Sequence, residues 1–164
     1  ISYPTAVYTV PLGVILPKDV DNLLLPVPVS GSHIGFSTLR MEPCWMALGQ
    51  AAGITAALAI DKGVKVRNVD IPSLQDILIK QKATLIYFRD VKPTDDAFPL
   101  VQYLGLRGYL PDWNASLQQP IDESTLRNWS NLCGTQLKAT PGQTTRLKVL
   151  TDIYKLQSER TGLF

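Results

Sequence analysis

The sequence has few of the residues on which metal centres and disulfide scaffolds depend. Its 164 residues include two cysteines and one histidine. Two cysteines cannot form a disulfide framework or a zinc site by themselves, and one histidine excludes a histidine-rich cluster. We therefore expect no metal site. Charge is also scarce, because charged residues make up 18% of the chain and 16 basic against 14 acidic residues give a net charge of +2. Since the basic residues are scattered, no nucleic-acid partner is expected.

The hydrophobic content is sufficient for a folded protein. Hydrophobic residues make up 45% of the chain, which excludes a disordered polymer and fits one ordinary domain or two small ones. The chain opens with ISYPTAVYTV, without an initiator methionine or a signal-type segment. We interpret it as part of a longer protein. Its compartment stays open, with export from a bacterial cell as one alternative.

The first half of the chain is apolar and is divided by turn residues. Two short apolar runs, residues 5–10 and 22–28, predict strands. Pro26 and Pro28 end the second run, because proline cannot donate to a sheet ladder. The glycine and serine content of residues 30–40 predicts a loop. Residues 85–88 predict either a closing strand or a link to the second half.

The strongest helix signal covers residues 42–63. Glu42 and Pro43 suit a first helical turn, and Gly63 suits the C-terminal stop. Residues 43–60 carry no charge and approach the length of a membrane span. Because Gln50 and Thr55 interrupt this window, we predict a long buried helix of a soluble protein and no membrane partner. Residues 71–83 predict a shorter amphipathic helix.

The second half, residues 87–164, is more polar and predicts a small helical unit. Its first helix is expected near residues 97–108. The second should span residues 123–133, capped by Asp122 and closed by Gly134. The third should begin near residue 144, where apolar residues recur at helical spacing.

No nucleophile elbow, phosphate loop, paired carboxylates or metal-ligand spacing is present. The concentrated candidate site is the loop-to-helix junction at residues 30–43. Glycine and serine there permit close backbone approach, and the start of the following helix presents free N–H groups. Such a junction suits a phosphate, a carboxylate or a delocalised anion. His33 and Arg40 could contribute hydrogen bonds or charge; the alternatives are a packed histidine and an ordinary surface ion pair.

Residues 10–64 resemble the C-terminal end of the FAD-dependent oxidoreductase family. The resemblance is carried, in order, by PKDVDNLL, SGSH, LRMEP and GQAAGITAALA. It covers roughly residues 7–82, about half of the chain. Some members of this branch are labelled xanthan lyases, a name that the flavin motifs do not support.

The resemblance implies that this segment closes the flavin site. Asn22 would end the turn before the last strand, and Ser32 and His33 would line a loop near the isoalloxazine ring. Three further positions would present backbone N–H groups to the pyrimidine edge of the ring: Thr38, Leu39 and Arg40. The implied fold class is α+β. Residues 1–86 would be a fragment of an α/β FAD-binding domain, with short strands and one long buried helix, and residues 87–164 a small all-α domain.

The family's dinucleotide fingerprint, GxGxxG after a first strand, does not occur in these residues. We therefore expect FAD in the full-length parent protein, with no FAD bound and no turnover by this chain alone. The expected partner is the missing N-terminal half of the same protein. The apolar helix at residues 42–63 could alternatively mediate oligomerisation.

A second likeness lies in residues 87–132, which are similar to one S-layer-homology repeat. Such repeats bind cell-wall polysaccharide in some bacterial proteins. The second helix lacks the Thr-Arg-Ala-Glu signature of those repeats, so a helical cap without a ligand is the alternative. The second function considered is accordingly a carbohydrate-associated module of a polysaccharide-degrading or wall-anchored protein. Its stacking faces would be Trp113, Tyr109 and Trp129, of which Trp129 lies on the apolar stripe and is expected in the core. A structural fragment that needs a partner is the third.

Overall fold

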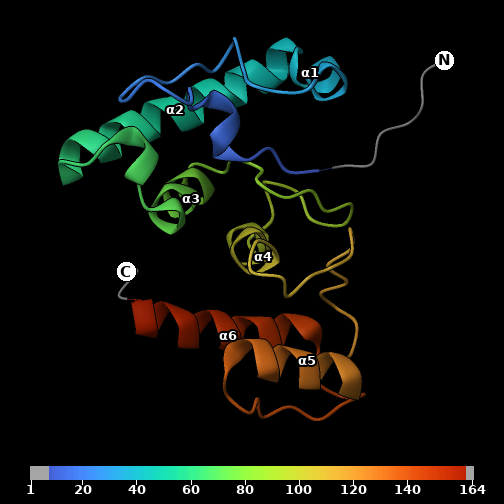
Figure 1. Cartoon of the computed structure of the whole chain (residues 1–164). Coiled ribbons are helices and arrows are strands. Elements are labelled where there is room, and N and C mark those ends of the chain that lie inside the picture. Colours follow the sequence, from blue (N-terminus) through green and yellow to red (C-terminus); the bar gives the residue numbers. More distant parts are fainter. Residues whose placement is uncertain (1–7, 162–164) are drawn as a thin grey trace. The chain divides into compact units, whose positions relative to one another are not determined.

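The computed structural model describes residues 8–161, which form helices and no β-strand (Figure 1). The chain divides into two compact units, Ile1–Leu85 and Ile86–Phe164. The first unit contains the 3₁₀ turns η1 (Leu12–Ile15) and η2 (Val66–Asn68) and the helices α1 (His33–Leu39), α2 (Glu42–Lys62) and α3 (Ile71–Lys80). The second contains α4 (Phe98–Gly105), α5 (Glu123–Cys133) and α6 (Arg146–Thr161).

The predicted α+β fold with short strands is wrong for the described residues. Part of the first expected strand, residues 5–7, lies outside them, and residues 8–10 have no regular structure. Within the second expected strand, residues 22–28, Leu25 N–H donates to the Ile15 carbonyl at 2.8 Å. Two residues after this run, Ser30 N–H donates to the Val14 carbonyl at 2.7 Å. These isolated bonds do not form a ladder, because Pro26 and Pro28 lack N–H groups and the partner segment turns through η1.

Residues 85–88 do not form a strand either. The backbone of Ile86 is satisfied by a side chain, since Gln102 Nε2 donates to the Ile86 carbonyl at 2.7 Å and Ile86 N–H donates to Gln102 Oε1 at 3.0 Å. The buried Gln102 amide on α4 thus makes the two backbone hydrogen bonds that a neighbouring strand would otherwise make. The segment is the link between the two units, which was one of the two sequence expectations.

The expected loop at residues 30–40 contains helix α1. Ser32 is its N-cap and accepts a hydrogen bond from Gly35 N–H at 3.1 Å. Leu39 anchors its last turn in a hydrophobic cluster. Ser32 is one of the residues that suggested a loop, but it caps the start of a helix, because serine is a favoured N-cap residue.

Helix α2 confirms the predicted helix, and Gly63 follows it with a left-handed φ of 62°. The helix is not the buried element that we expected, because only Leu48, Ala52, Thr55 and Ala59 are buried. Its length and composition would suffice to cross a membrane, and 22% of its most apolar window is buried. Cys44, Ala51, Ile54 and Leu58 are partly buried against the two hydrophobic clusters, whereas residues such as Met46 and Ile60 remain exposed.

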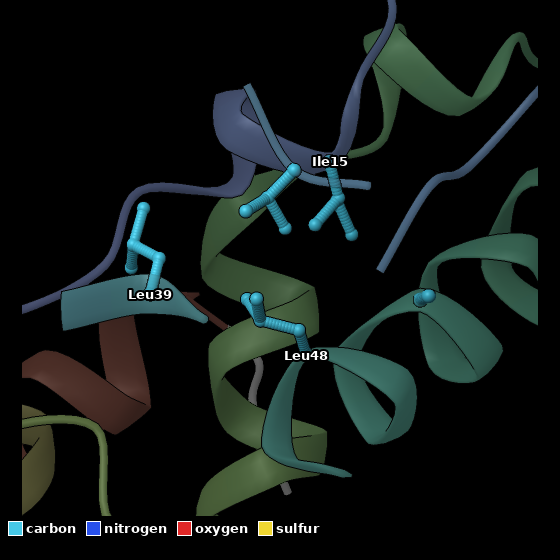
Figure 2. Close-up of a cluster of buried hydrophobic side chains, with 5 residues drawn as sticks. Ile15, Leu39 and Leu48 are labelled. Atoms are coloured by element: carbon cyan, nitrogen blue, oxygen red, sulfur yellow. The ribbon is translucent and has the colours of Figure 1, made fainter. Parts of the chain in front are cut away.

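The first unit has its core on one side of α2. Ile15, Leu39 and Leu48 come from three different elements and belong to one cluster (Figure 2). A second cluster joins the C-terminal half of α2 to η2 and α3 through Ala59, Val66 and Leu74. These contacts explain why α2 packs against η1, η2 and α3. The clusters position the α1–α2 junction, which is the candidate site.

In the second unit, the described residues form the helices α4, α5 and α6 around a core of their own. Asp122 caps α5, and Gly134 ends it with a φ of 65°, so both sequence-predicted ends are confirmed. Helix α4 packs against α6. The fully buried side chains that form the centre of the unit include Phe98, Leu104, Tyr109, Ile121, Trp129, Leu150 and Ile153.

Candidate functional site

The candidate junction is a short helix followed directly by a long one. Ser32 uses its hydroxyl oxygen to accept from Gly35 N–H, so this atom already serves α1. His33 is the first residue of α1 and its side chain is exposed. Both residues are exposed, and of the two side chains only that of Ser32 has a hydrogen bond among those identified in the described residues.

The three residues at the end of α1 have different surroundings. Thr38 Oγ1 donates to the Gly35 carbonyl at 2.9 Å and also hydrogen-bonds with the Tyr8 hydroxyl. The Leu39 side chain is buried in the core, whereas the Arg40 side chain is exposed. Arg40 N–H donates to the Phe36 carbonyl at 3.0 Å, so this N–H closes α1. The accessible group is therefore the Arg40 guanidinium.

The start of α2 offers an anion fewer donors than a typical helix N-terminus. Met41 precedes the helix without a side-chain cap, and its carbonyl accepts from Cys44 N–H at 2.9 Å and Trp45 N–H at 3.2 Å. Pro43 has no N–H to donate. Glu42 places a carboxylate in the first turn, where it complements the helix dipole. A second anion would compete with this carboxylate.

Trp45 is a residue that sequence reasoning missed. Its Nε1 atom is enclosed and has no hydrogen-bond partner among the described residues. An enclosed donor left unpaired costs about 1–3 kcal/mol, and such groups are rare in folded proteins. Trp45 lies one turn after the junction, so it marks a position where an additional acceptor would be stabilised. No local sequence signal distinguishes this tryptophan from an ordinary core residue.

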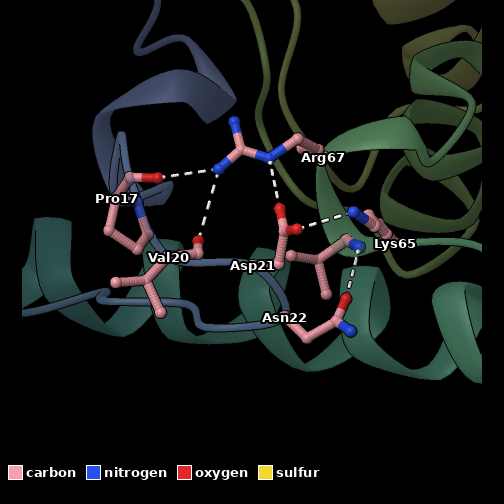
Figure 3. Close-up of polar contacts among 7 residues, drawn as sticks. Pro17, Val20, Asp21, Asn22, Lys65 and Arg67 are labelled. Atoms are coloured by element: carbon pink, nitrogen blue, oxygen red, sulfur yellow. Dashed lines mark hydrogen bonds and ion pairs between the residues drawn. The ribbon is translucent and has the colours of Figure 1, made fainter.

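Asn22 lies in a turn that is clasped to η2 (Figure 3). It has a positive φ of 56°, and its Oδ1 accepts from Val66 N–H at 3.3 Å. Beside it, the Asp21 carboxylate pairs with Lys65 Nζ at 2.6 Å and Arg67 Nε at 3.1 Å. The Asn22 amide oxygen is thus engaged in holding the chain turn.

Arg67 adds to this clasp through the backbone. Its NH2 group donates to the Pro17 carbonyl at 2.9 Å and the Val20 carbonyl at 3.3 Å (Figure 3). Hydrogen bonding from Lys65, followed by that from Arg67, lowers the pKa of the Asp21 carboxyl. Because the cluster is largely exposed, its ion pairs contribute little individually. Its role is to fix the turn relative to η2.

One face of α2 is apolar, uncharged and open. Met46 and Ile60 lie along it with 76% and 83% of their surfaces exposed. A Cβ atom added at Gly49 or Gly53 would meet nothing within 4 Å. Glycine in a helix interior costs roughly 1 kcal/mol relative to alanine, and no contact among the described residues makes use of the space at these two positions. We call Met46, Gly49, Gly53, Ala57 and Ile60 the open face of α2.

Comparison with known protein families shows a match in the first unit. Residues 1–78 match the FAD dependent oxidoreductase family. The match covers most of the first unit and all six residues singled out above as flavin-site candidates. No curated protein and no solved structure matches the chain. The matched segment is therefore similar to a flavin-dependent oxidoreductase region, and the family implies FAD in the parent protein.

The junction partly fits a flavin. His33 and Arg40 are exposed and form no ion pair within residues 8–161, so both could face an electron-rich ring edge. The Trp45 Nε1 donor is enclosed, so a ligand at the surface of the junction does not reach it in this structure. Ser32 and Thr38 have side-chain oxygens already engaged within α1. The fit therefore depends on His33 and Arg40, and the flavin role of all six predicted residues stays a prediction.

Proposed function

We propose that residues 1–78 close the isoalloxazine end of the FAD site in a flavin-dependent oxidoreductase. The observation that carries this proposal is the family match over the segment that contains SGSH, LRMEP and GQAAG. The pyrophosphate cradle would come from residues outside this chain, because these 164 residues contain no GxGxxG fingerprint. The chain by itself would then have no turnover.

Within this proposal, the protein contributes charge and hydrogen bonds at one edge of the ring. FAD, when bound, supplies the redox chemistry by accepting two electrons and a proton from a substrate. Arg40 would stabilise negative charge at the ring edge, since a guanidinium remains protonated throughout the physiological range. His33, at the other end of α1, would add a hydrogen bond. Both side chains are exposed on the same short helical segment.

The open face of α2 is an apolar surface that residues beyond this chain would cover. Burying exposed apolar surface is favourable by about 25 cal/mol per Å², and the open glycines would let another backbone approach closely. We propose that the remainder of the flavin domain covers this face. Self-association through the same face is the outcome expected when that remainder is absent.

The experiment compares this chain with a version extended by the residues encoded upstream. Both are purified without added flavin, and bound FAD is measured from the visible absorbance and released cofactor. We expect FAD in the extended protein and none in the 164-residue chain. In the extended protein, Arg40→Met should lower flavin occupancy and make the bound flavin harder to reduce, which a redox titration measures.

The matched control is Arg127→Met, which removes the same charge from an exposed position on α5. It should leave both flavin occupancy and reduction potential unchanged. Stoichiometric FAD in the 164-residue chain would contradict the proposed division of the site. Equal potentials for the wild-type and Arg40→Met proteins would contradict the role of Arg40.

A further inference from the structure

An open groove of about 580 Å³ runs along one face of α5 in the second unit. Residues about one helical turn apart on α5 form one wall, and the connection that follows α5 and runs back along it forms the other (Figure 1). The lining residues are Glu123, Leu126, Arg127, Ser130, Asn131, Gly134, Thr135, Gln136 and Leu137. The flavin proposal does not use this groove, because all of its lining belongs to the second unit.

The returning connection is held against α5 by hydrogen bonds to one serine. Leu137 N–H donates to Ser130 Oγ at 3.2 Å, and Ser130 Oγ donates to the Leu126 carbonyl at 2.8 Å. Thr135 N–H donates to the Ser130 carbonyl at 3.2 Å. The Leu137 side chain is buried and anchors the same segment. Because both walls are fixed before a ligand arrives, binding costs less conformational entropy.

Two carboxamides of the lining remain available to a ligand. The side chains of Asn131 and Gln136 stand on opposite walls, are exposed and have no hydrogen-bond partner among the described residues. Each carboxamide offers an acceptor oxygen and two N–H donors. In the same unit, the Gln102 carboxamide already binds a peptide backbone, since it accepts from Ile86 N–H at 3.0 Å and donates to the Ile86 carbonyl at 2.7 Å. The groove thus presents groups that can pair with the backbone of another segment.

The remaining lining favours a ligand without net charge. The two charged side chains, Glu123 and Arg127, pair with each other at 3.3 Å. Leu126 and Leu137 contribute apolar surface. None of the described lining residues is aromatic, so the groove lacks a flat ring face against which a sugar would stack. The lining therefore suits a peptide better than a carbohydrate.

We propose that this groove binds an extended, uncharged peptide segment with an apolar side chain at its centre. Helix α5 has 11 residues, so the groove is about 16 Å long, a length that about five residues of extended chain would span. The carboxamides of Asn131 and Gln136 hydrogen-bond the peptide backbone from opposite walls. The apolar side chain of the peptide packs against Leu126 and Leu137.

The test measures peptide binding to the full chain by NMR titration of the nitrogen-15-labelled protein. The probe is the capped peptide acetyl-Ser-Thr-Leu-Thr-Ser-amide. Two matched probes differ from it in one respect each: in one, both threonine amide nitrogens are methylated, and in the other, glycine replaces leucine. We expect the parent peptide to shift the amide resonances of α5 and of residues 134–137. Each matched probe should bind at least about tenfold more weakly, because the first loses backbone donors and the second loses the apolar side chain.

Two variants locate the site. Gln136→Ala should weaken binding of the parent peptide by about tenfold, with an unchanged far-UV circular dichroism spectrum, because its side chain is exposed. Gln118→Ala is the matched control: it removes the same carboxamide from an exposed position outside the groove and should leave the affinity unchanged.

Three results with the peptides would overturn the proposal: equal loss of affinity in both variants, equal binding of the parent and methylated peptides, or no binding of the parent peptide at millimolar concentration. Tighter binding of the neutral oligosaccharide cellopentaose at the same resonances would also overturn it, because the groove would then be a carbohydrate site. None of these outcomes bears on flavin binding by residues 1–78.

Discussion

Trp129 Nε1 donates a hydrogen bond to the Tyr109 carbonyl at 2.7 Å, and both side chains are almost completely buried. The two rings also meet edge to face, with centroids 6.5 Å apart. Tyr109 follows α4 and Trp129 lies on α5, so this pair connects two helices of the second unit. Burial and the neighbouring Cys133 thiol raise the pKa of Tyr109 to about 12.

The indole ring of Trp129 should contribute to stability through its hydrogen bond and through its buried bulk. Trp129→Phe keeps an aromatic ring but leaves the Tyr109 carbonyl without this partner, and we expect a loss of about 1–3 kcal/mol in the free energy of unfolding of the second unit. Hydrogen exchange of the α5 amides provides the measurement. Trp113→Phe is the control, because Trp113 is partly exposed, and it should change stability by less than about 0.5 kcal/mol. Equal effects of the two substitutions would argue against the role of the hydrogen bond.

The buried amide of Gln102 should be among the most sensitive polar groups of the second unit. Gln102→Leu preserves approximate volume but removes both partners of the Ile86 backbone, so we expect a loss of about 3 kcal/mol. Urea unfolding followed by near-UV circular dichroism measures this change. Gln118→Leu, at an exposed position, should have a small effect. If Gln102→Leu proves as stable as the wild-type protein, the amide does not substitute for a strand.

Because Asp122 caps α5 as a carboxylate, we expect the second unit to lose stability in acid. Hydrogen bonds from the Ser124 hydroxyl, the Thr125 hydroxyl and Thr125 N–H hold the pKa of Asp122 well below its ordinary value of 3.8. The unfolded chain therefore takes up a proton on this residue more readily than the folded one. The stabilisation is present above pH about 4 and decreases as the pH falls below that value.

Asp122→Asn should remove this pH dependence while keeping a capping oxygen. The melting temperature of the second unit, measured from about pH 6 to pH 2.5, should fall less steeply with acid in this variant than in the wild-type protein. Asp96→Asn makes the same charge change at another exposed position and should follow the wild-type curve. Parallel curves for wild type and Asp122→Asn would show that the cap does not control the acid response.

Substitutions at Asn22 should separate the effect of its backbone conformation on stability from that of its side-chain hydrogen bond. Asn22→Ala and Asn22→Gly both lose the bond to Val66 N–H, but alanine is strained at a φ of 56° and glycine is not. We expect the alanine variant to be less stable by about 1 kcal/mol in urea unfolding. Asn68 has no positive φ, so glycine there should not be more stable than alanine. The same order at both positions would exclude strain as the cause.

Local chemistry made most helices predictable. Asp122 and Gly134 mark the ends of α5 through capping, and Gly63 ends α2 because glycine readily adopts a left-handed conformation. Neighbouring residues supply these interactions, so they can be identified without the rest of the fold. The similarity of residues 1–78 to a flavin-dependent oxidoreductase region was likewise visible from the order of its motifs.

Strand formation was not predictable in the same way, because a strand requires a partner. The apolar run at residues 22–28 has proline at two positions and meets only isolated backbone acceptors. In the run at residues 85–88, the Ile86 backbone pairs with the side chain of Gln102. The burial of α2 was overestimated for a related reason, since its composition does not specify which elements cover it.

The sequence by itself determined where α2 and α5 begin and end, the scarcity of metal ligands and the likeness of the first half to a flavoprotein segment. Tertiary structure alone decided which of the candidate groups are accessible. It placed Leu39 in the core, engaged Asn22 with η2, enclosed Trp45 Nε1 and brought Arg89 and Arg146 to one pocket. The physical reason is that capping and turn formation depend on adjacent residues, whereas burial and the meeting of charges depend on contacts between residues distant in sequence.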